Sequence, residues 1–154
     1  MGYYWLNHRR EDRSGYSDVE GEVYHYRSTV AGSKQFSEGD WFVYYRPGEH
    51  VLFGAGHVQE IEIVGETEEQ VDSIAAEVQP NVPSSRSITD YLAHMTDYRP
   101  FDPPVSARKI KEEISFLRGR QGLSGVPQNS IYSIDREDYV TILEAAGEED
   151  LLNE

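Results

Sequence analysis

Cysteine is absent from this chain of 154 residues, and lysine occurs only at Lys34, Lys109 and Lys111. Without cysteine there are no disulfides and no metal sites built on thiolates. No apolar run approaches the roughly 18 residues of a membrane-spanning helix, and the first residues lack the pattern of a secretory signal. We therefore expect a soluble, cytoplasmic protein with one domain that is long enough to bury its own core.

Negative charge dominates, with 28 acidic residues against 14 lysines and arginines and a formal net charge of −14. This balance disfavours indiscriminate nucleic-acid binding, which rests on cationic contacts. Acid-rich, lysine-poor surfaces also keep proteins soluble in concentrated salt, so we favour a halophilic source. The basic residues gather in clusters, at Arg9, Arg10, Arg13, Arg99, Arg108, Lys109, Lys111, Arg118 and Arg120. A cluster of this kind is as readily a solvated face as an anion site.

The clearest structural signal is a predicted β-hairpin in the middle of the first half. Trp41 to Tyr45 is a run of aromatic and β-branched residues that favours a strand, and Pro47-Gly48 is typical of a turn. Alternating apolar residues from Val51 to Ile63 predict a long second strand. Gly54 and Gly56 interrupt it, which indicates either a bend in a barrel strand or a close approach by a ligand.

The remaining pattern predicts short strands and a few short helices. Strands are expected at Tyr3–Asn7, Glu22–Arg27, Leu123–Val126 and Ser130–Ile134, and helices at Glu66–Val78, Ser106–Leu117 (capped by Ser106) and Asp135–Ala146, where Asp135 and Asp138 resemble a helix-start signal and Gly147 ends the helix. Glu22–Arg27 could also be a loop, and Ser87–Tyr98 fits a helix or a strand. The fold class is α+β: a small barrel flanked by short helices.

Catalytic and metal-binding patterns are missing from the sequence. The five histidines, His8, His25, His50, His57 and His94, have no metal-ligand spacing. No nucleophile-elbow, Walker or dinucleotide-binding context occurs. We therefore expect no catalytic residues, no metal and no cofactor in these residues.

Aromatic residues are plentiful instead: eleven tyrosines and two tryptophans, concentrated between Tyr3 and Tyr45. Flat rings can sandwich a planar ligand, and each base–aromatic stack contributes roughly 1–3 kcal/mol. Asn7, Ser33, Gln35 and the histidines could supply hydrogen bonds to the edge of that ligand. The alternative is that these rings form the core and the strand surfaces.

Several of these pieces, in their order, resemble the EVE domains of the PUA-like superfamily, relatives of YTH and ASCH domains. The similarity is carried by Tyr4-Trp5-Leu6-Asn7, by Gly39-Asp40 with the strand that ends in Tyr44-Tyr45, by Phe53-Gly54-Ala55-Gly56, and by Phe101–Val105, Ile114–Val126 and Asp135–Leu143 in the C-terminal half. It covers residues 1–147, which leaves 148–154 as an acidic tail or linker, and the acidic segment 66–86 departs from the family pattern.

The resemblance implies a PUA-like twisted β-barrel with a pocket for a base flipped out of DNA. The base would be 5-methylcytosine, 5-hydroxymethylcytosine or N6-methyladenine, and the domain would give a modification-dependent HNH restriction endonuclease its specificity. By this resemblance the base pocket would include Trp5, Asn7, Ser33, Gln35, Trp41, Tyr44 and Tyr45, with His25 and Tyr26 added on composition, and phosphate contacts would come from Arg9, Arg10, Arg46, Arg118 and Arg120. The alternatives are an RNA-binding PUA-like module and an ASCH-type nucleoside-processing enzyme.

Overall fold

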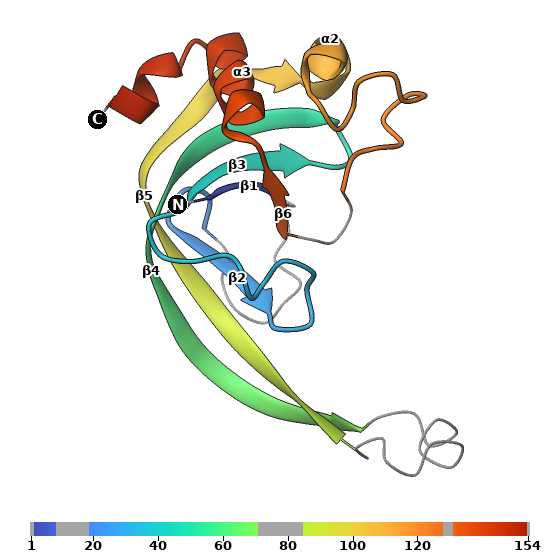
Figure 1. The fold of residues 1–154 in the computed structure, drawn as a ribbon. Helices are drawn as coiled ribbons and strands as arrows, with labels where there is room; N and C mark the ends of the chain where they lie inside the picture. The colour runs from blue at the N-terminus through green and yellow to red at the C-terminus, as the bar shows by residue number, and fades with distance from the viewer. Residues whose placement is uncertain (1, 9–18, 71–84, 128–130, 154) are drawn as a thin grey trace.

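The computed structural model describes residues 2–8, 19–70, 85–127 and 131–153, which form one strongly curved sheet with helices gathered at one end (Figure 1). Its strands are β1 (Tyr3–Asn7), β2 (Val23–Arg27), β3 (Trp41–Arg46), β4 (Val51–Gln70), β5 (Ser85–Ser106) and β6 (Ile131–Ile134). Their order across the sheet is β2-β5-β4-β3-β1-β6; β1 and β3 run parallel and the other neighbours antiparallel. The α+β class is confirmed, although β2 and β6 stand at opposite edges and no closed barrel is seen among the described residues.

The helical elements are α2 (Ala107–Ile110), the 3-10 helix η1 (Lys111–Glu113), α3 (Arg136–Ala146) and the 3-10 helix η2 (Glu149–Asn153). Within the described residues, no helix is long and apolar enough to cross a membrane.

The predicted central hairpin is confirmed, and its glycines have a packing role. β3 pairs with β4 so that Trp41 lies opposite His57, with the turn between Arg46 and Val51. A β-carbon at Gly54 would lie 2.1 Å from the hydroxyl oxygen of Tyr98, and one at Gly56 would lie 2.9 Å from the ring of Phe42. The groups that approach these glycines closely are therefore rings of the chain itself.

The second half of β4 and the first residues of β5 form an arm that extends past the end of β2 (Figure 1). Glu66 pairs with Thr89 and Gln70 with Ser85. The helix expected at Glu66–Val78 is thus wrong for residues 66–70, while 71–78 lie outside the described residues. Ser87–Tyr98, which fitted helix or strand, belongs to β5. Both segments are strands because each pairs with a partner that is distant in the sequence, and the spacing of apolar residues within a segment does not reveal that pairing.

The C-terminal half follows the expected apolar pattern with different boundaries. The helix expected at Ser106–Leu117 is confirmed only over α2 and η1, because residues 114–117 form a bend and turns. Ser106 makes no capping side-chain bond, and Leu123–Val126 forms turns instead of a strand. α3 is confirmed, with Gly147 in the left-handed conformation at its end. Its start differs, because Asp135 makes no side-chain cap and the Asp138 carboxylate accepts the backbone N–H of Ser115 at 2.9 Å.

The acidic end expected as a solvated tail or linker is folded onto the domain over residues 149–153. These residues form η2, and Leu151 is fully buried in the core beside α3. The Arg99 guanidinium on β5 holds the same segment through the carboxylates of Glu148 at 3.2 Å and Asp150 at 2.6 Å.

Two apolar cores lie on the two faces of the sheet. The core on the helix side contains Trp5, Tyr45, Tyr139 and Leu151, among others. The second core contains Tyr4, Tyr26, Phe36 and Tyr44, among others. Because successive side chains of a strand point to opposite faces, Trp5 belongs to one core and its neighbour Tyr4 to the other.

Candidate functional site

The sheet divides the rings that were expected to share one pocket. Trp5 and Tyr45 are 0% and 2% exposed in the helix-side core, with ring centroids 4.9 Å apart. Tyr44 and Tyr26 are buried in the other core, where Tyr26 stacks on Tyr91 at 5.0 Å. The structure therefore does not bring these four rings together around one ligand.

Trp41 packs at the margin of the helix-side core, and Asn7 lies at the end of β1. The half-buried Trp41 stacks on His57 with ring centroids 4.3 Å apart. The Asn7 side-chain amide donates to the carbonyl of Pro127 at 3.0 Å, and the Asn7 carbonyl accepts the Tyr24 hydroxyl at 3.2 Å. Asn7 thus ties the end of β1 to β2 and to the chain that precedes β6.

Among the predicted pocket residues, Ser33 and Gln35 line recesses that the described residues form. The loop between β2 and β3 forms an open hollow of about 380 Å³ lined by residues 28–35. Beside it lies a second hollow of about 610 Å³, lined by Gly2, Tyr4, Gln35, Ser37, Glu38, Gly39 and Asp40. Because Gln35 lines both, these two hollows are treated as one candidate site, named here the 28–35 hollow and the Tyr4 hollow.

The 28–35 hollow is built by backbone turns and one glycine. The N–H of Ser33 donates to the carbonyl of Val30 at 3.1 Å, and the N–H of Gln35 donates to the carbonyl of Gly32 at 3.1 Å. Gly32 has φ +87°, and a β-carbon there would lie 1.9 Å from the carbonyl oxygen of Ile131. Only glycine allows the loop to approach the start of β6 this closely.

Ser33 forms a hydrogen bond within its own loop. Its hydroxyl is buried and donates to the carbonyl of Ser28 at 3.0 Å. Ser33→Ala should therefore lower the free energy of unfolding, measured by urea denaturation, by about 1 kcal/mol, because it leaves that carbonyl without its donor. The matched control is Ser37→Ala, which removes an exposed bond to Gln35 and should change stability by less than about 0.5 kcal/mol. Equal losses in the two variants would contradict a structural role for Ser33.

The Tyr4 hollow presents mainly hydrogen-bond acceptors. Both oxygens of the buried Asp40 carboxylate are positioned, by the backbone N–H groups of Gly2 and Ser37 at 2.8 Å each. The Tyr4 hydroxyl donates to the carbonyl of Gln35 at 3.1 Å. Burial, and then the nearby charge of Asp40, raises the pKa of Tyr4, which keeps the phenol protonated. Two carboxylates, Glu38 and Asp40, suit a ligand that brings N–H donors.

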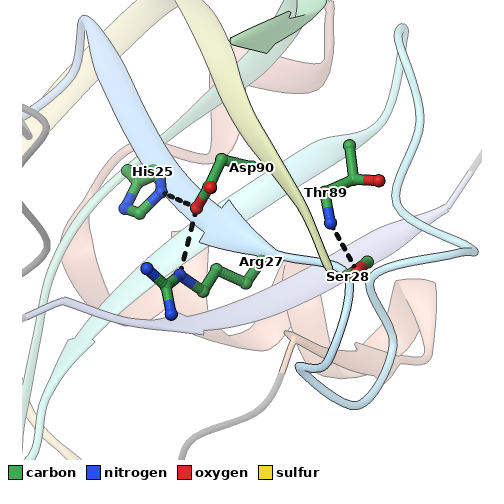
Figure 2. Close-up of polar contacts among 5 residues, drawn as sticks. All are labelled: His25, Arg27, Ser28, Thr89 and Asp90. Carbon is green, nitrogen blue, oxygen red and sulfur yellow. Dashed lines mark hydrogen bonds and ion pairs between the residues drawn. The ribbon is translucent and has the colours of Figure 1, made fainter. Parts of the chain in front are cut away.

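A buried polar cluster joins β2 to β5 (Figure 2). One oxygen of the Asp90 carboxylate contacts His25 Nε2 at 2.9 Å and accepts Arg27 Nε at 3.0 Å. Burial alone would raise the pKa of Asp90, but the hydrogen bonds from His25 and Arg27 and the charge of Arg27 outweigh it, so this pKa is lowered. His25, expected in the base pocket, lies in this cluster instead. Asp90 was missed because only the strand register places it opposite Arg27.

The predicted phosphate contacts have unequal exposure. Arg46 is 9% exposed; its guanidinium lies over the Phe53 ring at 4.1 Å and donates to Glu49 at 3.3 Å. Arg118 and Arg120 are exposed, each using Nε to bind a backbone carbonyl. Arg9 and Arg10 lie outside the described residues.

Two segments without acidic residues meet next to the 28–35 hollow. Residues 23–37 and 114–134 contain no aspartate or glutamate, although the chain has 28 of them. The two segments join where the N–H of Ile131 donates to the carbonyl of Ala31 at 2.8 Å. Lys34, Arg118 and Arg120 belong to these segments. We call the described parts of the two segments the acid-free surface. Within the described residues, no group of three histidines or acids is placed to hold a metal ion.

Comparisons with known proteins identify no family. No family model matches the sequence, and no curated protein matches it. Among solved structures, the fold is similar to the N-terminal domain of Staphylothermus marinus McrB, with a TM-score of 0.49, 14% sequence identity, and coverage of 81% of this chain and 84% of that chain. This similarity is too low to carry a functional assignment.

Proposed function

We propose that this domain binds nucleic acid and recognises one modified base, which it receives flipped out of the duplex. The acid-free surface carries the proposal: on a chain with a net charge of −14, its two segments contribute no carboxylate of their own against a polyanion, and the Glu112 and Asp138 carboxylates that contact it are bound to the N–H groups of Gly119 and Ser115. The resemblance of the sequence to EVE domains supports the base-reading part of the proposal. A module of this kind would give a modification-dependent nuclease its specificity.

The Tyr4 hollow is the proposed base site. Asp40 and Glu38 line it, and the Tyr4 phenol forms part of its wall. Carboxylates accept the exocyclic amino group of cytosine or adenine, whereas thymine would set a carbonyl oxygen against them. Flipping the base out of the duplex costs a few kcal/mol of free energy, which the contacts in the Tyr4 hollow must offset. Discrimination against thymine would come from repulsion between its carbonyl oxygen and these two carboxylates, since Glu38 is exposed and Asp40 already accepts the N–H groups of Gly2 and Ser37.

The extra group on the base contributes less than the amino group does. One buried methyl contributes about 0.8 kcal/mol, which is about fourfold in affinity. In gel-shift titrations, a duplex with a single 5-methylcytosine should therefore bind about fourfold more tightly than the unmodified duplex. A hydroxymethyl group whose hydroxyl finds a partner should do better. Equal affinity for the modified and unmodified duplexes would remove the reader proposal.

Thymine provides a sharp control, because it has the shape of 5-methylcytosine with a carbonyl in place of the amino group. A T·G mismatch is easier to flip than a paired 5-methylcytosine. We expect the 5-methylcytosine duplex to bind more tightly nonetheless, and stronger binding to T·G would show that flipping cost alone governs affinity. A matched RNA hairpin in the same assay tests the RNA-binding alternative: preference for the RNA would replace DNA as the ligand.

A further inference from the structure

We propose that the 28–35 hollow is a phosphate subsite, in which Lys34 and the hydroxyls of Ser28 and Thr29 hold one phosphodiester of the bound strand. The inference rests on the proposed function and adds a contact that the sequence did not indicate. All three residues line this hollow. Lys34 is exposed and is one of only three lysines in the chain.

The charge around the hollow favours an anion. The sequence has no carboxylate between residues 23 and 37, so the ammonium group of Lys34 lies in a segment that carries positive charge. A Lys ammonium is a compact point charge with three donors, which suits a phosphate oxygen. The adjoining Tyr4 hollow is lined by Glu38 and Asp40, whose carboxylates would repel a phosphate. The two hollows on either side of Gln35 therefore differ in the charge of the ligand that each accepts.

Ser28 is held in position before any ligand arrives (Figure 2). Its N–H donates to the carbonyl of Thr89 at 2.9 Å, and its hydroxyl oxygen accepts the N–H of Thr89 at 2.9 Å. The second bond uses an acceptor lone pair and leaves the hydroxyl hydrogen for another partner. Its carbonyl accepts the Ser33 hydroxyl. A donor that is fixed in advance loses little entropy when it binds.

Arg27 is adjacent in sequence and does not belong to this subsite. Figure 2 shows its guanidinium on the side of the strand that holds Asp90 and His25, whereas Ser28 lies past the strand end beside Thr89. At the end of β2, the Arg27 guanidinium is therefore bound to the Asp90 carboxylate, whereas the Ser28 hydroxyl lies in a loop without acidic residues.

The first test is the salt dependence of duplex binding by Lys34→Gln. One lost phosphate contact lowers the slope of log K against log salt by about 0.9, so the affinity ratio of wild type to variant should fall about 3.5-fold between 50 and 200 mM salt. Affinity should fall equally for modified and unmodified duplexes, because a phosphate contact carries no base information. Lys109→Gln, at an exposed position of α2, is the control with the same change in charge. An equal loss of slope in both variants would overturn the subsite.

The second test does not depend on base recognition. Inorganic phosphate is titrated into the wild-type protein while backbone amide shifts are recorded by NMR, and saturable shifts are expected at Thr29, Gly32 and Lys34, with loss of saturation in Lys34→Gln. If these amides move but no nucleic acid binds, the proposed function fails and the subsite stands. If they do not move and Lys34→Gln keeps the wild-type salt slope, the subsite is disproved.

Discussion

Trp5→Ala should lower the free energy of unfolding by about 3–5 kcal/mol, the range for removing a fully buried large aromatic side chain. Trp5 is 0% exposed, and its ring centroid lies 4.9 Å from that of Tyr45 and 5.3 Å from that of Phe116, with which it packs in a T-shaped arrangement. These contacts join β1 to β3 and to the chain that follows η1. The loss should be measured by urea denaturation, with an unchanged m-value as the sign that the folded state is otherwise intact.

The control for Trp5→Ala is Ile63→Ala. Ile63 lies on β4 and is 62% exposed, so its truncation should change stability by less than about 0.5 kcal/mol. Trp5→Phe separates ring packing from the indole N–H: it should cost less than Trp5→Ala, because Nε1 is buried and has no hydrogen-bond partner among the described residues. A loss below about 1 kcal/mol for Trp5→Ala, far under the range for a buried aromatic, together with loss of modified-base preference, would instead make Trp5 a wall of the base pocket.

The strand pattern explains why some of the fold was predictable and the ring pocket was not. Alternation and the Pro47-Gly48 turn were enough to place the hairpin of β3 and β4. The same alternation requires that adjacent residues such as Tyr44 and Tyr45 point to opposite faces of the sheet. They lie in different cores, as that rule demands. A cage containing both was therefore incompatible with the predicted strand.

Contacts between distant segments could not be read from the sequence. The arm depends on β4 pairing with β5 beyond the end of β2, and local spacing around Glu66 favoured a helix instead. Similarly, the contact of Ala31 with Ile131 creates the acid-free surface from two segments that are far apart in the chain. Composition alone showed basic residues in separate islands and gave no reason to join them.

The polar cluster between β2 and β5 illustrates the same limit and has a large expected effect. Asp90→Ala should lower the free energy of unfolding by about 1–3 kcal/mol, because it removes a buried acceptor that is shared by the buried His25 and the half-exposed Arg27. Asp90 is 3% exposed, and its carboxylate is the shared partner of His25 and Arg27. Asp90→Asn keeps an oxygen acceptor and loses the charge, so it should lie between wild type and Asp90→Ala.

The pH dependence of unfolding distinguishes this cluster from ordinary packing. The pKa of Asp90 is lowered from 3.8 in the folded protein. A group with a depressed folded pKa stabilises the protein above its unfolded pKa, and that stabilisation is lost as pH falls through the folded value. The stability difference between wild type and Asp90→Ala should therefore be constant at neutral pH and shrink below about pH 3.8. A difference that stays constant down to pH 2 would mean that packing of the side chain, and not its charge, supports the junction of β2 and β5.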